Sequence, residues 1–164
     1  MNPSIRYLES DTDILLAWPV VHALRPHLVH SEYLAQVREQ EKQGYRMIGL
    51  VLPSEGMTGL AEPSEGLAEP SEVIASFSGF RAMHKLSGGR GIYIDDLSTL
   101  PEHRGKGYGG MLLDYIHDLA RREGIENVQL DSGHHRHPAH RLYLNKGYAI
   151  TAHHFTIPLG SGTL

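Results

Sequence analysis

The sequence predicts an α/β (α+β) protein in which one mixed β-sheet carries helices on its faces. Segments that alternate apolar and polar residues, as half-buried strands do, are separated by segments with helical spacing and helix-capping residues. The expected elements follow the order β-α-α-β-β-β-α-β-α-β. A chain of 164 residues, 40% of them hydrophobic, is long enough to form one domain around a single core.

The N-terminal third predicts a strand over 4–9, a helix over 14–25, a helix over 31–44 and a strand over 45–52. Ser10 and Asp13 stand three residues apart, as in a capping box at the start of the first helix. Pro19 predicts a kink or an end within that helix, and Pro26 stops it. Ser31 is expected to cap the second helix.

A perfect tandem repeat follows the strand over 45–52. The heptad Gly-Leu-Ala-Glu-Pro-Ser-Glu occupies residues 59–65 and again 66–72. A segment rich in Gly, Pro, Ser and Glu offers no periodic apolar face, so we expect a flexible insertion over about 54–72 in a strand–strand connection. An acidic lid or a partner-binding segment is the functional alternative.

The remaining elements are predicted as a strand over 73–84, a strand over 91–100, a helix over 107–123, a strand over 127–130, a helix over 138–147 and a strand over 148–159. The turn at Gly88 and Gly89 joins the first two strands into an antiparallel hairpin. Pro138 suits the first turn of the last helix, and Gly147 ends it.

A glycine-rich basic turn separates the strand over 91–100 from the helix that follows. Residues 97–110 read Leu-Ser-Thr-Leu-Pro-Glu-His-Arg-Gly-Lys-Gly-Tyr-Gly-Gly. Glycines let backbone N–H groups converge on one point, and a helix start adds unpaired donors and partial positive charge. Arg104 and Lys106 add full charges. The segment therefore predicts a site for the pyrophosphate of a cofactor.

Two other interpretations of this turn stay open. Gly105, Gly107 and Gly110 also satisfy the G-x-G-x-x-G pattern of dinucleotide-binding proteins, with Asp131 after the next strand. In dinucleotide-binding proteins the strand leads directly into the first glycine, whereas here residues 101–104 intervene. Little parallel βα sequence remains for a second half of such a fold. A glycine turn without a ligand is the other alternative, which the cations and the helix start disfavour.

Two motifs resemble one family. The pattern Arg104-x-x-Gly107-x-Gly109, preceded by Leu97-x-Thr99-x-Pro101, resembles the cofactor segment of the GNAT superfamily of acyl-CoA N-acyltransferases. The segment from Ala139 through Tyr143 to Gly147-Tyr148 resembles that family's second signature, and the chain is similar to a small bacterial branch. The resemblance implies a mixed, mostly antiparallel sheet with a splayed parallel strand pair, and a single N-acetyltransferase domain over 1–164.

The resemblance implies that acetyl-CoA is the cosubstrate and lies between the strands over 91–100 and 127–130. The pantetheine arm would pair with the main chain of 97–99, and the pyrophosphate would bind N–H groups from 104 to 109. The implied cofactor-binding residues are Leu97, Ser98, Thr99, Arg104, Gly105, Lys106, Gly107, Tyr108, Gly109 and Gly110. Arg136 stands where the family often has a cofactor-contacting asparagine.

The implied reaction is direct attack of a primary amine on the thioester in a ternary complex. Tyr143 matches the family's tyrosine and is the candidate acid for the departing thiolate, because a phenol is protonated at neutral pH. An ordinary buried helix tyrosine is the alternative. The acceptor is expected to be a small cationic amine, although a protein lysine or N-terminus would also suit. A non-catalytic acyl-CoA-binding module on the same fold is the alternative function.

Asp95 and Asp96 lie on the strand over 91–100, just ahead of the residues that would pair with the cofactor. The resemblance to amine acetyltransferases with an acidic pair here implies a base that works through water, or an anchor for a cation. Alternation along a strand predicts that only one of them faces the cleft. Asp95 is favoured because it is in step with Leu97. A solvated strand end, or an ion pair with Arg90, is the alternative.

Six histidines, at 134, 135, 137, 140, 153 and 154, invite a zinc hypothesis. Zinc ligands need fixed spacing and supporting carboxylates, which this cluster lacks, so no metal is expected. An exposed helix face, or a role in substrate binding or proton relay near Tyr143, is favoured instead.

Composition limits the partners and the location. A net charge of −4 argues against nucleic-acid binding, and no apolar run is long enough to cross a membrane. The absence of cysteine excludes disulfides, and the N-terminus does not resemble a secretion signal, so a cytoplasmic protein is expected. The resemblance leaves a homodimer open.

Overall fold

The computed structural model describes residues 3–54 and 71–159. The chain divides into two compact units, residues 1–130 and 131–164, and each is described by itself. Nearly all of the expected insertion over 54–72 lies outside the described residues. At its described ends, the Ser71 carbonyl accepts a hydrogen bond from the N–H of Ser54 at 2.8 Å.

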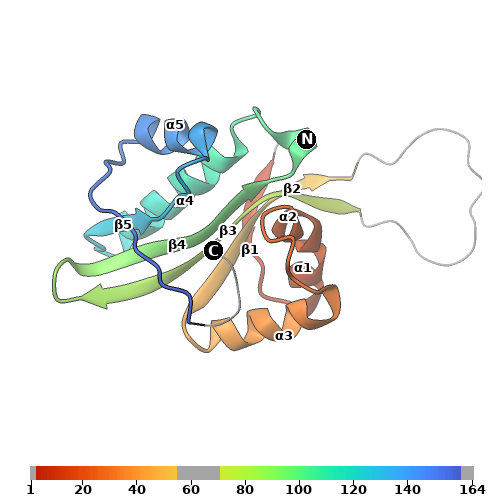
Figure 1. Cartoon of the computed structure of the whole chain (residues 1–164). Helices are drawn as coiled ribbons and strands as arrows, with labels where there is room; N and C mark the ends of the chain where they lie inside the picture. The colour runs from red at the N-terminus through yellow and green to blue at the C-terminus, as the bar shows by residue number, and fades with distance from the viewer. Residues whose placement is uncertain (1–2, 55–70, 160–164) are drawn as a thin grey trace, which may run out of the picture. The chain divides into compact units, whose positions relative to one another are not determined.

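The first unit contains a five-stranded sheet whose strands lie side by side in chain order (Figure 1). Three neighbouring pairs are antiparallel and the last pair is parallel, which confirms the predicted mixed, mostly antiparallel sheet. The strands are β1 (Ser4–Tyr7), β2 (Tyr45–Pro53), β3 (Glu72–Lys85), β4 (Gly89–Thr99) and β5 (Asn127–Leu130).

Three helices connect β1 to β2: α1 (Asp11–Leu16), α2 (Trp18–His22) and α3 (His30–Glu41). The predicted capping box forms, because the Ser10 hydroxyl accepts the N–H of Asp13 at 3.0 Å. The predicted kink is a break at Ala17, which places Pro19 in the first turn of α2, where its missing N–H costs no hydrogen bond. Ser31 does not cap α3, which begins one residue earlier with Val29 as its N-cap.

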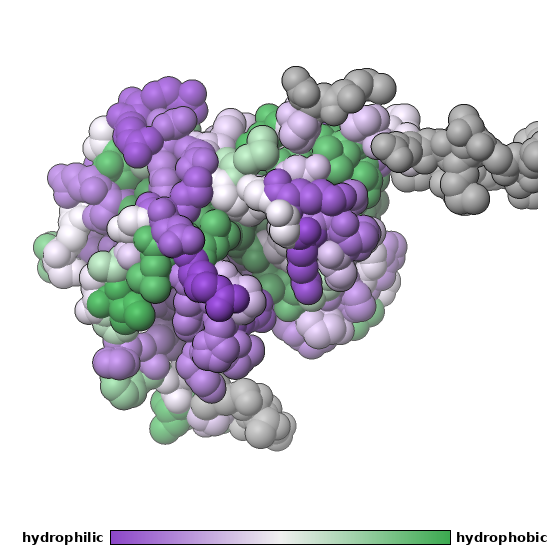
Figure 2. Space-filling view, turned by 90° about the horizontal axis from the view of Figure 1, so that it is seen from above, coloured by the Kyte–Doolittle hydropathy of each residue, from purple (hydrophilic) through white to green (hydrophobic). Residues whose placement is uncertain are grey.

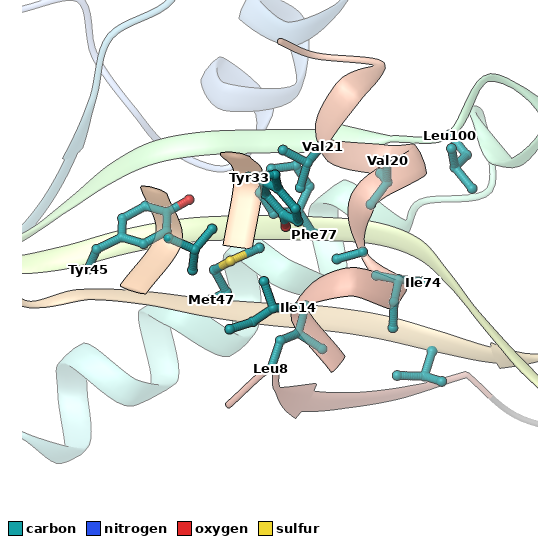
Figure 3. Close-up of a cluster of buried hydrophobic side chains, with 13 residues drawn as sticks. Leu8, Ile14, Val20, Val21, Tyr33, Tyr45, Met47, Ile74, Phe77 and Leu100 are labelled. Carbon is teal, nitrogen blue, oxygen red and sulfur yellow. The ribbon is translucent and has the colours of Figure 1, made fainter. Parts of the chain in front are cut away.

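Helices cover both faces of the sheet (Figure 1). Tyr45, Met47 and Val51 of β2 pack into a core with α1–α3, which Figure 3 shows. Ile48 and Leu50 alternate with them, are equally buried and lie outside that cluster. Helix α4 (Tyr108–Arg122) contacts β2–β5 and buries its apolar stripe: Leu112, Leu113, Ile116, Leu119 and Ala120.

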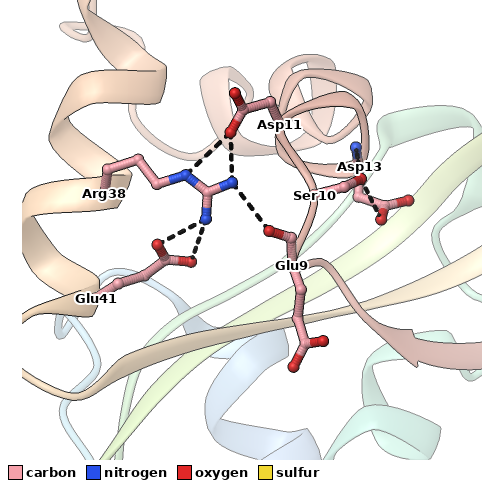
Figure 4. A network of polar contacts seen from close by, with 6 residues as sticks. All are labelled: Glu9, Ser10, Asp11, Asp13, Arg38 and Glu41. Atoms are coloured by element: carbon pink, nitrogen blue, oxygen red, sulfur yellow. Dashed lines mark hydrogen bonds and ion pairs between the residues drawn. The ribbon is translucent and has the colours of Figure 1, made fainter.

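Polar and aromatic contacts join α3 to the helices before it. The Arg38 guanidinium bonds the carboxylates of Asp11 and Glu41 and the main-chain oxygen of Glu9 (Figure 4). The indole ring of Trp18, on α2, packs with its centroid 4.7 Å from the ring of His22, 4.9 Å from that of His30 and 5.2 Å from that of Tyr33.

The second unit contains α5 (His137–Asn145), with Pro138 in its first turn and Gly147 following it at a φ of +89°, as predicted. The predicted strand over 148–159 is wrong, because none of these described residues is in a strand. Ile150 is 79% exposed and Phe155 is 89% exposed. Alternation shows which face of a strand would be buried, but a strand forms only when a neighbour accepts its hydrogen bonds.

Among the described residues, no helix is long and apolar enough to span a bilayer. Figure 2 shows hydrophilic and hydrophobic residues both reaching the surface in the face that it presents.

Candidate active site

Strand β4 loses its parallel partner halfway along its length. Residues Gly91–Ile94 pair with Asn127–Leu130 of β5, and the pairing ends there. On the other edge, β4 stays paired with β3 as far as Thr99. Within the described sheet, residues 95–99 therefore leave one edge without a strand partner, and an extended ligand with amide groups can add to such an edge.

A β-bulge lies at the point where the two strands part. Gly79 of β3 pairs with Asp96 and Phe80 pairs with Ile94, so Asp95 has no counterpart. An extra residue bends a strand and shifts its alternation of faces. The shift places Leu100 in the core under α1–α3.

The bulge brings both carboxylates to the face that carries α1–α3. Asp95 Oδ2 accepts the Nε–H of Arg81 at 2.8 Å. Asp96 Oδ1 accepts the Nε–H of Arg25 at 2.9 Å, and its Oδ2 accepts the hydroxyl of Tyr45, a member of the α1–α3 core, at 2.9 Å. The expectation that strand alternation places the two carboxylates on opposite faces is therefore wrong.

Two further expectations about Asp95 are corrected. The bulge breaks the two-residue step between Asp95 and Leu97 that favoured Asp95 over its neighbour. The ion pair considered for Asp95 forms with Arg81, not with Arg90. Each carboxylate of the acidic pair thus has its own arginine partner, so the local charge is balanced.

The glycine-rich turn joins β4 to α4 through a short 3-10 helix, η1 (Pro101–His103). Gly105 and Gly107 have φ values of +77° and +82°, and a Cβ at either position would meet no atom within 4 Å. Backbone conformation, not crowding, therefore requires glycine here. Gly107 is the N-cap of α4 and has no side chain to accept the first N–H groups of the helix, so these donors remain for an anion.

Two cations flank these donors. Arg104 donates from Nε to the Thr99 carbonyl at 3.2 Å, and Lys106 Nζ lies 3.2 Å from His103 Nδ1. Among the described residues, neither cation forms an ion pair with a carboxylate, so both charges are available to a ligand. The turn therefore combines aligned donors with uncompensated positive charge, which suits a pyrophosphate.

Tyr143 belongs to the second unit, on α5. Its ring centroid lies 5.9 Å from that of Tyr148. Burial raises the pKa of Tyr143, and the positive charge of Arg136 opposes that shift only in part. The phenol is therefore protonated at neutral pH, as its predicted role as an acid requires.

Two histidines of the second unit, His140 and His154, contact polar protein groups. His154 Nδ1 lies 2.9 Å from Asp131 Oδ2, and His140 Nε2 lies 3.0 Å from the Gly133 carbonyl oxygen. Within residues 3–54 and 71–159, no three His, Cys, Asp or Glu side chains form a group that could hold a metal ion.

Sequence reasoning missed Arg25, Tyr45 and Arg81, which hold the acidic pair. They lie 71, 51 and 14 residues from their carboxylates. No local spacing links such positions. Gly79 was the one available signal, because a glycine inside a long apolar strand indicates a bulge or a close approach by another group.

A family model described as "Acetyltransferase (GNAT) family" matches residues 29–148. An uncharacterized N-acetyltransferase of Bacillus subtilis, YhdJ, is 29% identical over 157 residues, which cover 94% of this chain and 98% of that protein. The aminoalkylphosphonate N-acetyltransferase of Salmonella typhimurium is 38% identical over 63 residues, 38% of this chain and 41% of that protein.

The fold is also similar to solved structures. That of a ribosomal-protein-alanine N-acetyltransferase from Brucella melitensis has a TM-score of 0.73 at 17% identity, covering 97% of this chain and 100% of that one. A Trypanosoma brucei acetyltransferase has a TM-score of 0.69 at 20% identity, covering 96% and 100%. The sheet has one parallel pair in its described part, unlike the repeated parallel units of dinucleotide-binding folds.

Proposed function

The chain belongs to the GNAT family of acetyltransferases, and from this premise we propose that it transfers the acetyl group of acetyl-CoA to a primary amine. The single observation that carries the proposal is the turn before α4. There, two left-handed glycines, Gly105 and Gly107, lead into a helix start that no side chain caps. The diphosphate of coenzyme A is an anion of the kind that such a turn binds.

We assign the pyrophosphate to the N–H groups between Arg104 and Gly109, with Lys106 as a second charge and the start of α4, through Gly110, behind them. We assign the pantetheine arm to Leu97, Ser98 and Thr99. Support comes from the edge of β4 that β5 leaves without a strand partner, because an amide-bearing arm can pair with such an edge as an added strand.

The proposed reaction proceeds in a ternary complex. The lone pair of the neutral amine attacks the thioester carbon, a C–N bond forms, and the C–S bond breaks. The sulfur takes its proton from the Tyr143 hydroxyl, and the amine nitrogen releases its surplus proton. Main-chain N–H groups near Leu97 would stabilise the oxyanion.

We assign the removal of a proton from the acceptor to the acidic pair Asp95 and Asp96, acting through water. Both carboxylates lie on the same face, which supports either one in this role. The pair attracts a cationic amine only weakly, because Arg25 and Arg81 balance its charge. An acceptor panel should therefore include diamines, lysine peptides, protein N-termini and aminoalkylphosphonates, the last because a relative's name specifies them.

The test is release of free thiol from acetyl-CoA in the presence of each amine, with mass spectrometry of the acetylated product. We expect thiol release that depends on both substrates, together with CoA binding in calorimetry. An NAD titration serves as the control ligand and should give no binding. Binding of CoA without transfer to any primary amine would favour a non-catalytic acyl-CoA-binding module and overturn the proposal.

A further inference from the structure

We propose that Tyr45 is a positioning residue for the cofactor strand. Through its hydroxyl it holds Asp96 at the β4 bulge, and so sets the path of the residues that follow, Leu97–Thr99. The inference rests on the proposed function, because it concerns the strand assigned to the pantetheine arm.

The phenol of Tyr45 spans three strands. It starts on β2, passes over β3 at Gly79 and reaches β4. A Cβ built on Gly79 would lie 1.8 Å from the Tyr45 hydroxyl oxygen and 2.3 Å from its Cζ, so the ring occupies the space above that glycine. Its hydroxyl ends 2.9 Å from Asp96 Oδ2, and Figure 3 shows the oxygen at the end of the ring remote from β2.

The bulge is bonded from several directions. Arg25 donates from Nε to the Asp96 carboxylate at 2.9 Å and from Nη2 to the Asp95 carbonyl at 3.3 Å. The Ser78 hydroxyl donates to the Asp96 carbonyl at 2.9 Å. A bulged residue lacks hydrogen-bond partners in the strand ladder, so these side-chain hydrogen bonds fix the conformation of the bulge instead. Tyr45 and Ser78 are the buried donors of the set, at 5% and 0% exposure, and Tyr45 is the one that bonds the Asp96 carboxylate.

The cofactor strand depends on this set because β5 no longer supports it. Pairing with β5 ends at Ile94, one residue before the bulge. Beyond that point, in the described sheet, the strand pairing of β4 continues with β3 alone, and the Ser76 hydroxyl of β3 bonds the Ser98 carbonyl at 2.7 Å. A change in the bulge is therefore transmitted directly to Leu97 and its neighbours, whose main chain would meet the ligand.

Burial, together with the nearby Asp96 charge, raises the pKa of Tyr45 well above its usual range. The hydroxyl thus remains a donor throughout the pH range in which the enzyme can be assayed. It contributes a fixed hydrogen bond to Asp96 and no proton to the reaction.

Tyr33 offers a matched control in the same core. It is also a buried phenol, 2% exposed, but its hydroxyl has no hydrogen-bond partner among the described residues. Tyr33→Phe removes the same atom as Tyr45→Phe without removing a bond to β4. A buried hydroxyl without a partner can be deleted at little cost to the fold.

The experiment measures the dissociation constant of CoA by calorimetry and the KM for acetyl-CoA and for the acceptor. Wild type should bind CoA. Tyr45→Phe should weaken CoA binding about tenfold, as expected for loss of one hydrogen bond to a charged group. It should raise the KM for acetyl-CoA and leave that for the acceptor unchanged. Tyr33→Phe should bind CoA within about twofold of wild type.

A double-mutant cycle distinguishes positioning from packing. If Tyr45 acts through Asp96, then Tyr45→Phe should have no further effect on CoA binding in an Asp96→Ala background, where no side-chain acceptor remains for the hydroxyl. Additive effects would overturn the inference, as would wild-type CoA binding by Tyr45→Phe. If Tyr45→Phe does not fold, Arg25→Gln takes its place, because this side chain is 43% exposed and its loss is tolerable. It too should weaken CoA binding. Failure of the wild type to bind CoA would overturn the proposed function instead.

Discussion

Tyr143 is the side chain on which the proposed chemistry depends most directly. Tyr143→Phe keeps the ring and removes the proton donor, so we expect kcat to fall by about 10²-fold or more while the dissociation constant of CoA stays the same. Because burial raises the pKa of Tyr143, loss of rate through its ionisation should begin only above about pH 10. Thiol release against pH in both proteins checks this, and an unchanged kcat would exclude Tyr143 from the mechanism.

Gly107 and Gly44 share a left-handed backbone conformation, so comparing their alanine variants separates an effect on stability from an effect on ligand binding. The φ of Gly107 is +82°, that of Gly44 is +85°, and neither would place a Cβ within 4 Å of another atom. Alanine at either position should lower the free energy of unfolding by about 1–2 kcal/mol, because both would force an L-residue into the left-handed region. Urea unfolding of the two variants measures this cost.

Only Gly107→Ala should also weaken CoA binding, because only Gly107 lies in the turn assigned to the pyrophosphate. We expect a loss of at least about tenfold, since a methyl group would stand beside the donors of the helix start. Equal CoA affinity in the Gly44 and Gly107 variants would place the pyrophosphate elsewhere.

Gly79 of β3 lies beneath the Tyr45 ring, which reaches from β2 to Asp96 on β4. Gly79→Ala would place a methyl group 1.8 Å from the Tyr45 hydroxyl, so we expect it to destabilise the fold by at least about 2 kcal/mol. Gly88→Ala, in the turn of the same hairpin, meets only an ordinary contact at 3.8 Å and should change stability by less than about 0.5 kcal/mol. Thermal unfolding of both variants tests the difference, and similar melting temperatures would contradict it.

Strand β4 shows how far the sequence predicts such an element and where it stops. Alternation predicts its hairpin with β3, and the glycine turn predicts where it ends. The alternation of residue types along β4 does not predict the bulge at Asp95. A residue is extra only by comparison with the strand that it pairs with, and the pattern of one strand does not specify that pairing. The partners of the acidic pair are unpredictable for the same reason, since they come from other strands and from the segment after α2.

The segment over 148–159 is the opposite case. Its alternation of Ile150 and other apolar residues matches the strand pattern, but the pattern carries no information about a partner. The two motifs predict the family correctly, because each is a short continuous segment. The strand over 148–159 could not be predicted in the same way, because its formation depends on pairing with a distant segment.

The distribution of charge over the molecule suits an anionic cosubstrate despite the net charge of −4. Many carboxylates are neutralised by neighbours, as Asp11 and Glu41 are by Arg38. Arg104 and Lys106, in contrast, have no carboxylate partner in the described part of the chain. Local rather than total charge therefore decides what the turn before α4 can bind.

Alkaline pH should destabilise the protein through its buried phenols. Burial raises the pKa of both Tyr33 and Tyr45, whereas in the unfolded chain a tyrosine titrates near pH 10. Below that pH both states keep the protons and stability is unaffected. Above it only the unfolded state releases them, so the free energy of unfolding should fall by about 1.4 kcal/mol per pH unit for each phenol.

Urea unfolding between pH 9 and 11 measures this slope. Other groups titrate in the same range, so the comparison is with Tyr33→Phe, which should remove one phenol's share of the slope. A variant whose stability depends on pH as steeply as that of the wild type would show that Tyr33 ionises equally in both states.

Trp18 is the only tryptophan in the chain, and its indole is enclosed by rings from both α2 and α3. Its fluorescence emission thus originates from a single spot, next to the segment that delivers Arg25 to β4. A ligand that displaces these two helices relative to each other would alter the emission intensity or wavelength without any added dye. The fold thereby contains its own optical reporter, and rapid-mixing experiments can test whether CoA or an amine changes its emission.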